Sequence, residues 1–141
     1  MLKTIVVALD CSDMSERVIE ALNMLQIKPE TKIILSHVLP SPGNDSDLAA
    51  DRPHQSQESV YQNMEKHLHS YQTRLPGSDL EIVSGDPAEE IIRLANIYGA
   101  DLIVLGTRGL KGVKRIIEGS VSSLVVAEAP CSVLVVKPAK V

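Results

Sequence analysis

The sequence predicts a single-domain α/β protein built on a doubly wound, five-stranded parallel sheet, and three observations support this prediction. Five short runs rich in Val, Ile and Leu are separated by stretches in which apolar residues recur at helical spacing. The runs lack the polar–apolar alternation of a half-exposed strand, so both faces of each strand should be covered. The 141 residues suit one domain, expected to span 1–141, and contain no internal repeat.

The first elements lie near the N-terminus. Thr4–Leu9 is a continuous run rich in β-branched residues, which is typical of a buried strand. Asp13 and Glu16 have the spacing of a capping box and predict a helix start. The apolar stripe of this helix is expected to consist of Val18, Ala21, Leu22 and Leu25. The second strand is predicted at Lys32–Val38.

The middle of the chain begins with a polar segment. Residues from about 40 to about 57 contain three prolines and many polar side chains, which indicates a variable surface loop. Helical spacing then predicts a helix over roughly 57–74, and Pro76 with Gly77 should end it. A short third strand is expected at Leu80–Val83.

Clear start and stop signals mark the next helix. Asp86 suits the N-cap, Pro87 the first helical position and Glu89 the third. Gly99 should close the helix. Its buried face is expected to consist of Ile91, Ile92 and Ala95.

The last third should hold two strands and one helix. The fourth strand is predicted at Asp101–Leu105 and the fifth at Cys131–Val136. Between them a helix should run from about Ser120 to Glu128, because Pro130 stops it. In a doubly wound sheet of this kind, ligands bind at the carboxyl ends of the strands where the winding reverses.

Composition excludes several function classes. The net charge of −4 disfavours a general nucleic-acid binder, and the lack of Phe and Trp removes most stacking platforms for single strands. No charge-free apolar stretch reaches the ~20 residues that span a bilayer, and the start of the chain does not read as a signal peptide. We therefore expect a cytoplasmic protein. Cys11 and Cys131 lack metal-ligand spacing, and Cys11 is either a reactive thiol or a small buried residue.

A glycine pattern follows the fourth strand and precedes the last helix. Gly106 and Gly109 stand three residues apart, and Gly119 with Ser120 follows after nine more. Unpaired backbone N–H groups and the positive end of a helix dipole would meet there, so the pattern predicts a phosphate cradle. The segment between the glycines carries four basic side chains that suit a polyanion, Arg108, Lys111, Lys114 and Arg115.

Asp10 follows the first strand at the same edge of the sheet as Gly106. Its carboxylate either accepts hydrogen bonds from a ribose or base, or holds Mg²⁺ through water, or simply begins a turn. Neither a P-loop motif nor a GxGxxG fingerprint is present. The four histidines do not assemble in the sequence with a nucleophile, so no catalytic residue is nominated.

Segments along nearly the whole chain, apart from the loop at 40–57, resemble one family. They are Val7–Ser12, His37 with Val38, Gly85–Pro87, and Ala100–Gly109 with Gly119 and Ser120. Together they resemble the universal stress protein family, and the spacing of Gly106, Gly109, Gly119 and Ser120 resembles the signature of its ATP-binding branch.

The resemblance implies an adenine nucleotide α-hydrolase-like fold with strand order 3-2-1-4-5 and ATP bound between strands one and four. It places four residues on the base and ribose, Ala8, Leu9, Asp10 and Val38. It places three on the ribose and α-phosphate, Gly106, Arg108 and Gly109. It places four on the outer phosphates, Gly119, Ser120, Val121 and Ser122. Mg²⁺ would be held through the ATP phosphates, and a homodimer would form through strand 131–136.

The function expected on these grounds is that of an ATP-binding universal stress protein acting as a nucleotide-dependent regulator or sensor with an unknown protein partner. Nucleotide occupancy would alter the surface offered to that partner. Two alternatives stay open. The chain is a slow Mg-dependent ATPase with at most weak hydrolysis, or it is an interaction module whose glycines are structural.

Overall fold

The computed structural model describes residues 2–10, 13–39, 55–107 and 120–138. Within those ranges the chain forms five strands and four helices. In order they are β1 (Thr4–Ala8), α1 (Asp13–Met24), β2 (Lys32–Leu39), α3 (Gln55–Arg74), β3 (Asp79–Ser84), α4 (Pro87–Tyr98), β4 (Leu102–Gly106), α5 (Ser120–Glu128) and β5 (Ser132–Val136). The predicted alternation of strand and helix is confirmed.

All strand pairs in the sheet are parallel, and the strand order is β3-β2-β1-β4-β5. This confirms the predicted fold class and order. β1 occupies the centre, with Val7 opposite Leu35 of β2 on one side and Val104 of β4 on the other. The chain winds outward through β2 and β3 and then returns to pair β4 with β1, so the winding reverses between β1 and β4.

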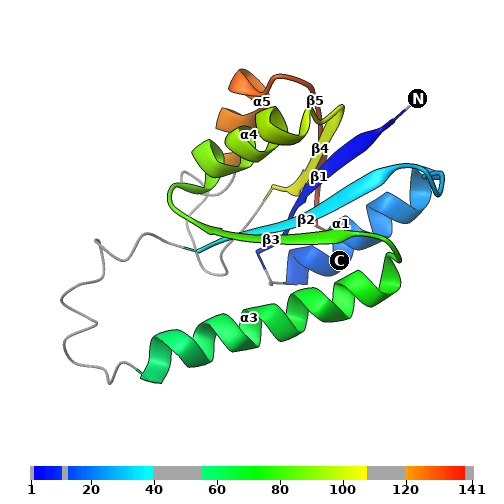
Figure 1. Cartoon of the computed structure of the whole chain (residues 1–141). Coiled ribbons are helices and arrows are strands. Elements are labelled where there is room, and N and C mark those ends of the chain that lie inside the picture. Colours follow the sequence, from blue (N-terminus) through cyan, green and yellow to red (C-terminus); the bar gives the residue numbers. More distant parts are fainter. Residues whose placement is uncertain (1, 11–12, 40–54, 108–119, 139–141) are drawn as a thin grey trace.

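Two hydrophobic layers cover the sheet. Figure 1 shows α1 and α3 on one face and α4 and α5 on the other. Residues of β1 alternate between the layers: Ile5 and Val7 pack with α1 and α3, whereas Val6 packs with α4 and α5. With no Phe or Trp in the chain, these layers are built mainly from aliphatic side chains.

The predicted signals of α4 are confirmed in detail. Asp86 has an extended backbone at the N-cap, and its side chain accepts a hydrogen bond from the Glu89 N–H. Pro87 begins the helix, and Gly99 ends it in the left-handed conformation at φ 60°. The buried face differs by one position, because Leu94 is buried where Ile92 was expected and Ile92 is partly buried.

Element boundaries differ from the sequence predictions by one or two residues. β1 ends at Ala8, β4 runs to Gly106, and α3 begins at Gln55 inside the predicted loop. Residues 40–54 lie outside the described ranges, so the rest of that loop prediction stays untested. The capping role predicted for the side chain of Asp13 also lies outside what the structure describes.

At the amino ends of the strands, which we call the amino edge, side chains close the sheet. The Asp101 carboxylate accepts hydrogen bonds from the Lys3 and Thr4 N–H groups at 2.8 and 3.1 Å. These bonds hold the pKa of Asp101 below its usual value. The Thr31 hydroxyl donates to the Leu2 carbonyl at 2.8 Å. The Lys3 and Thr4 N–H groups and the Leu2 carbonyl at this edge are therefore hydrogen bonded within the fold.

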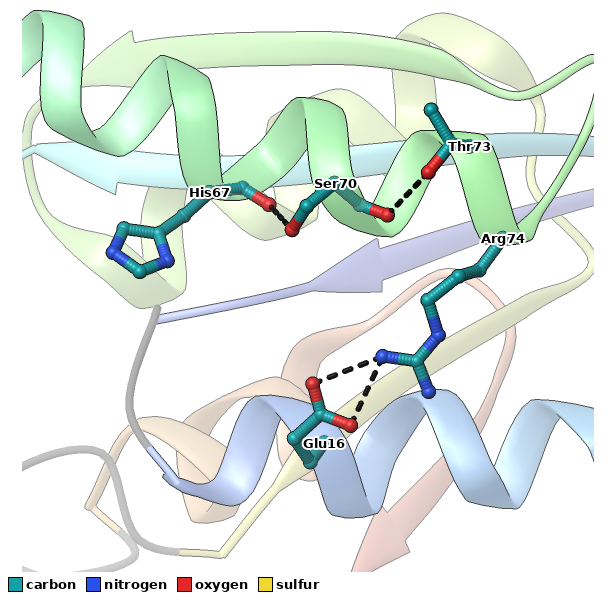
Figure 2. A network of polar contacts seen from close by, with 5 residues as sticks. All are labelled: Glu16, His67, Ser70, Thr73 and Arg74. Atoms are coloured by element: carbon teal, nitrogen blue, oxygen red, sulfur yellow. Dashed lines mark hydrogen bonds and ion pairs between the residues drawn. The ribbon is translucent and has the colours of Figure 1, made fainter.

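A second polar group near the amino edge joins α4 to the sheet. The Tyr98 hydroxyl donates to the Glu81 carboxylate, and this raises the pKa of Tyr98. The Lys32 ammonium lies 5.0 Å from the centre of the Tyr98 ring and 3.8 Å from the Asp79 carboxylate. Figure 2 shows a further tie on the opposite layer, where Arg74 of α3 pairs with Glu16 of α1 at 2.9 Å.

Candidate functional site

The carboxyl ends of β1, β2 and β4 form the opposite edge of the sheet, which we call the carboxyl edge. The predicted residues Ala8, Leu9 and Asp10 lie where β1 leaves the sheet. Ala8 and Asp10 are partly buried, whereas Leu9 is buried in the α1 and α3 layer. The winding reverses beside this exit, which is where open parallel sheets bind ligands.

Asp10 is tied to the first turns of α1. The hydroxyl of Ser15, which is only 1% exposed, donates to a carboxylate oxygen of Asp10 at 3.3 Å. This hydrogen bond orients the carboxylate and occupies one of its acceptor positions. The sequence did not indicate Ser15, because a serine inside a helical stripe carries no sign of its tertiary partner.

The exit of β2 lies beside that of β1. The Leu9 N–H donates to the Ser36 carbonyl at 2.8 Å, and the Ser36 hydroxyl donates to the Val7 carbonyl at 2.9 Å. His37 is buried, and its Nδ1 lies 2.7 Å from the Leu9 carbonyl oxygen. The predicted residue Val38 is partly buried against the α4 and α5 layer. Two adjacent strand exits are thus held together by side chains.

Gly106 is the last residue of β4, opposite Val136 of β5. Gly106 is not among the described residues with positive φ, so its backbone conformation alone does not require glycine. Its need for glycine is steric. A Cβ there would lie 2.9 Å from Cε and 3.4 Å from Cβ of the buried Met14.

The N-terminus of α5 belongs to the same edge, because a helix that precedes a parallel strand begins at the carboxyl edge. Ser120 is its first residue, Val121 is partly buried and Ser122 is buried. Arg108, Gly109 and Gly119 lie outside the described residues.

The structure therefore brings part of the predicted set together. Three of its apolar side chains pack against one hydrophobic layer, Ala8, Val38 and Val121. One carboxylate, Asp10, lies at the adjoining strand exit, and the N-terminal turn of α5 supplies backbone N–H donors. An apolar surface, a carboxylate and a helix N-terminus are the groups that a base, a ribose and a phosphate require.

Other site types find less support within the described ranges. No group of three or more His, Cys, Asp or Glu side chains could hold a metal ion there. Among the same residues, no helix is long and apolar enough to cross a membrane.

Comparison with known proteins identifies the family of the chain. The model of the universal stress protein family matches residues 1–137. The chain is 28% identical over 148 residues to universal stress protein Sll1388 of Synechocystis sp., covering 94% of this chain and 96% of that protein. It is 51% identical over 65 residues to a universal stress protein of Thermus aquaticus, covering 46% and 47% of the two chains.

Solved structures share the fold. Hypothetical protein MJ0577 superimposes with a TM-score of 0.80 at 25% identity, covering 99% of this chain and 98% of the other. A universal stress protein in complex with cAMP gives 0.68 at 24% identity over 96% and 97%. One from Archaeoglobus fulgidus in complex with dAMP gives 0.67 at 21% over 96% and 98%. With the family model covering nearly its whole length, this chain belongs to the universal stress protein family.

Proposed function

We propose that this protein binds an adenine nucleotide at the carboxyl edge, that ATP is its ligand, and that occupancy makes it a regulator or sensor in a stress response. The observation that carries the proposal is the juxtaposition at the switch point between β1 and β4. There the exits of two neighbouring strands bring Asp10 and Gly106 to the same edge as the N-terminus of α5.

The chemistry of each part suits one part of the nucleotide. The apolar side chains Ala8 and Val38 offer a surface for the base, and the oriented Asp10 carboxylate can accept from ribose hydroxyls. Gly106, Arg108 and Gly109 would line the ribose and α-phosphate. The start of α5 would hold the outer phosphates through Gly119, Ser120, Val121 and Ser122, with Mg²⁺ carried by the phosphates.

Two relatives of the same fold support a nucleotide ligand. One was solved with cAMP and another with dAMP, and both ligands contain adenine and a phosphate. Transfer to this chain rests on the family and on the carboxyl-edge geometry. ATP has the outer phosphates that cAMP and dAMP lack, and the start of α5 would supply hydrogen-bond donors for them.

Two further features complete the proposal. The protein would act in the cytoplasm, as a homodimer joined through strand 131–136. β5 is an edge strand of the sheet, and its residues Val133, Leu134 and Val135 are only partly buried. An apolar edge of this kind favours pairing with a second copy.

Calorimetric titration tests the proposal. Purified, nucleotide-free protein is titrated with Mg·ATP, ATP in EDTA, dAMP, cAMP and Mg·GTP. We expect one ATP per chain, weaker binding of cAMP and dAMP, and little binding of GTP. Asp10→Ala should weaken ATP binding about 10- to 100-fold, because a hydrogen bond to a charged group contributes roughly 1.5–3 kcal/mol.

The matched control for Asp10→Ala is Asp101→Ala, which removes a carboxylate at the amino edge that accepts from the Lys3 and Thr4 N–H groups. It should bind ATP like the wild type at a temperature where both are folded. No ATP binding by folded wild-type protein would contradict the proposal. A heat signal that continues after saturation, and that Asp10→Ala abolishes, would indicate hydrolysis and favour the ATPase alternative.

A further inference from the structure

His37 interrupts an apolar pattern. Residues of β2 that face the α1 and α3 layer recur every second position, and Ile33 and Leu35 before it are buried in that layer. His37 is the next residue on this face and is 7% exposed. Burying a polar ring at such a position costs free energy unless it is hydrogen bonded, so its partner is informative.

That partner is Leu9, the residue between the end of β1 and Asp10. The imidazole Nδ1 lies 2.7 Å from the Leu9 carbonyl oxygen. A carbonyl oxygen only accepts hydrogen bonds, so Nδ1 carries the proton and donates it. The Leu9 N–H already donates to the Ser36 carbonyl. Both backbone polar groups of Leu9, its N–H and its carbonyl, are therefore hydrogen bonded to residues of β2.

The hydrogen bond from His37 to the Leu9 carbonyl affects the backbone N–H of Val38, because backbone groups of β2 face β1 and β3 in alternation. The Ser36 carbonyl faces β1, and the Leu39 carbonyl faces β3, where it accepts from the Gly85 N–H. Backbone groups alternate sides along a central strand, so the Val38 N–H faces the exit of β1, like those of Ser36. Continuation of the parallel ladder would pair that N–H with the Leu9 carbonyl. His37 supplies a donor to the same carbonyl instead.

Resting on the proposed nucleotide site, we propose that His37 is a positioning residue for the base. Its Nδ1–H satisfies the Leu9 carbonyl, fixes the exit of β1 that leads to Asp10, and leaves the Val38 N–H to donate to a ring nitrogen of adenine. His37 itself touches no substrate in this account. It acts by determining which backbone donor at the carboxyl edge is available.

The test uses variants that separate the donor from the volume of the ring. His37→Leu fills the apolar position without a donor. His37→Asn places an amide N–H close to the position of Nδ1 and so preserves the donor. His69→Leu is the matched control, since His69 is exposed on α3 and contacts Gln72 within its own helix. Each variant is titrated with Mg·ATP. In a second titration, tripolyphosphate, which lacks the base, competes with bound Mg·ATP.

We expect His37→Leu to raise the Kd for ATP about tenfold, the size of roughly one net hydrogen bond. The asparagine variant should return to within about threefold of wild type, and tripolyphosphate should compete equally well in all variants, because it makes no contact that the Val38 N–H could supply. His69→Leu should bind ATP like the wild type. Urea unfolding without nucleotide is measured in parallel.

A merely structural histidine would behave differently. The inference is overturned if His37→Leu binds ATP like the wild type while unfolding more easily, if asparagine binds as weakly as leucine, or if tripolyphosphate loses as much affinity as ATP. Should His37→Leu fail to fold, His37→Gln replaces it, since glutamine moves the donor one bond further out. Failure of wild-type protein to bind ATP is a separate result, which contradicts the proposed function and the inference with it.

Discussion

Side chains form hydrogen bonds at both edges of the sheet, but the groups they bind differ between the two edges. At the amino edge, Asp101 accepts hydrogen bonds from the Lys3 and Thr4 N–H groups, and Thr31 donates to the Leu2 carbonyl. At the carboxyl edge, the side chains of Ser15 and His37 orient groups at the exit of β1. The side chains at the amino edge bind backbone groups of the fold, whereas the carboxyl edge presents a carboxylate and a helix N-terminus.

The difference separates stability from binding within one small domain. Substitutions at the amino edge should change the free energy of unfolding and leave ligand affinity intact. Substitutions at the carboxyl edge should change affinity, and should change stability only where a side chain also packs into the core. Gly106 and Met14 form such a place, because the cradle glycine lies directly over a core side chain.

The largest combined effect is expected from Gly106→Ala. The new Cβ would lie 2.9 Å from Met14 Cε, so the flexible end of the Met14 side chain must move within the core, at a cost of roughly 1 kcal/mol of unfolding free energy, the low end of the range for overpacking. Urea unfolding measures the loss, and ATP affinity should fall as well. The double variant Gly106→Ala with Met14→Ala should lose less unfolding free energy than the sum of the losses of the two single variants. Strict additivity would show that the Met14 contact does not limit residue 106.

Tyr98→Phe is the next largest and should affect stability alone. It removes the hydroxyl that donates to Glu81, at a cost of about 0.5–1.5 kcal/mol in urea unfolding. The raised pKa of Tyr98 adds an alkaline signature, because a folded pKa above the unfolded one gives stability that is lost as pH rises past about 10. Absorbance titration should show a late-ionising tyrosine in the wild type that is missing from the variant. A change in ATP affinity would break the separation of the edges.

Asp101→Asn should remove an acid-dependent part of the stability. The pKa of Asp101 is lowered by the Lys3 and Thr4 N–H groups, so its contribution is complete above the usual aspartate pKa of about 4 and is lost as pH falls through the lowered value. Urea midpoints of wild type and variant should differ at pH 6 and converge as the pH falls below the lowered pKa of Asp101. A difference that persists unchanged at low pH would mean that the carboxylate charge is not the cause.

The smallest effect is expected for Arg74→Ala, which breaks the ion pair with Glu16 between α3 and α1 (Figure 2). Both side chains are about half exposed, so the pair should contribute roughly 0–1 kcal/mol and less at high salt. Urea unfolding in 0.05 M and 1 M NaCl compares the two conditions. A loss as large as that of Tyr98→Phe, or one insensitive to salt, would show a packing role for the arginine stem.

The sequence predicted the features whose causes are local or periodic. Apolar runs located the strands, and Asp86, Pro87 and Gly99 marked the ends of α4 because caps act over three or four residues. The strand order came with the family resemblance. Boundaries moved by a residue or two, as at Gly106, where pairing with β5 extends β4.

The parts of the site that the sequence missed are contacts between distant residues. His37 reaches Leu9 across 28 positions of the chain. Met14 lies under Gly106, and its size, rather than a positive φ, explains the glycine. Neither pairing has a sequence period or a motif of its own. A histidine at an otherwise apolar position of a buried strand was the one signal that could have pointed to the first.

Amide chemical-shift mapping of the isotopically labelled protein during titration with Mg·ATP tests the division between the two edges most directly. We expect saturable shifts at Leu9, Val38 and Val121 on the carboxyl edge, with the signals of Lys3, Thr4 and Asp101 on the amino edge unmoved. Saturable shifts confined to the amino edge, or no shifts in folded, nucleotide-free protein at millimolar ATP, would contradict it.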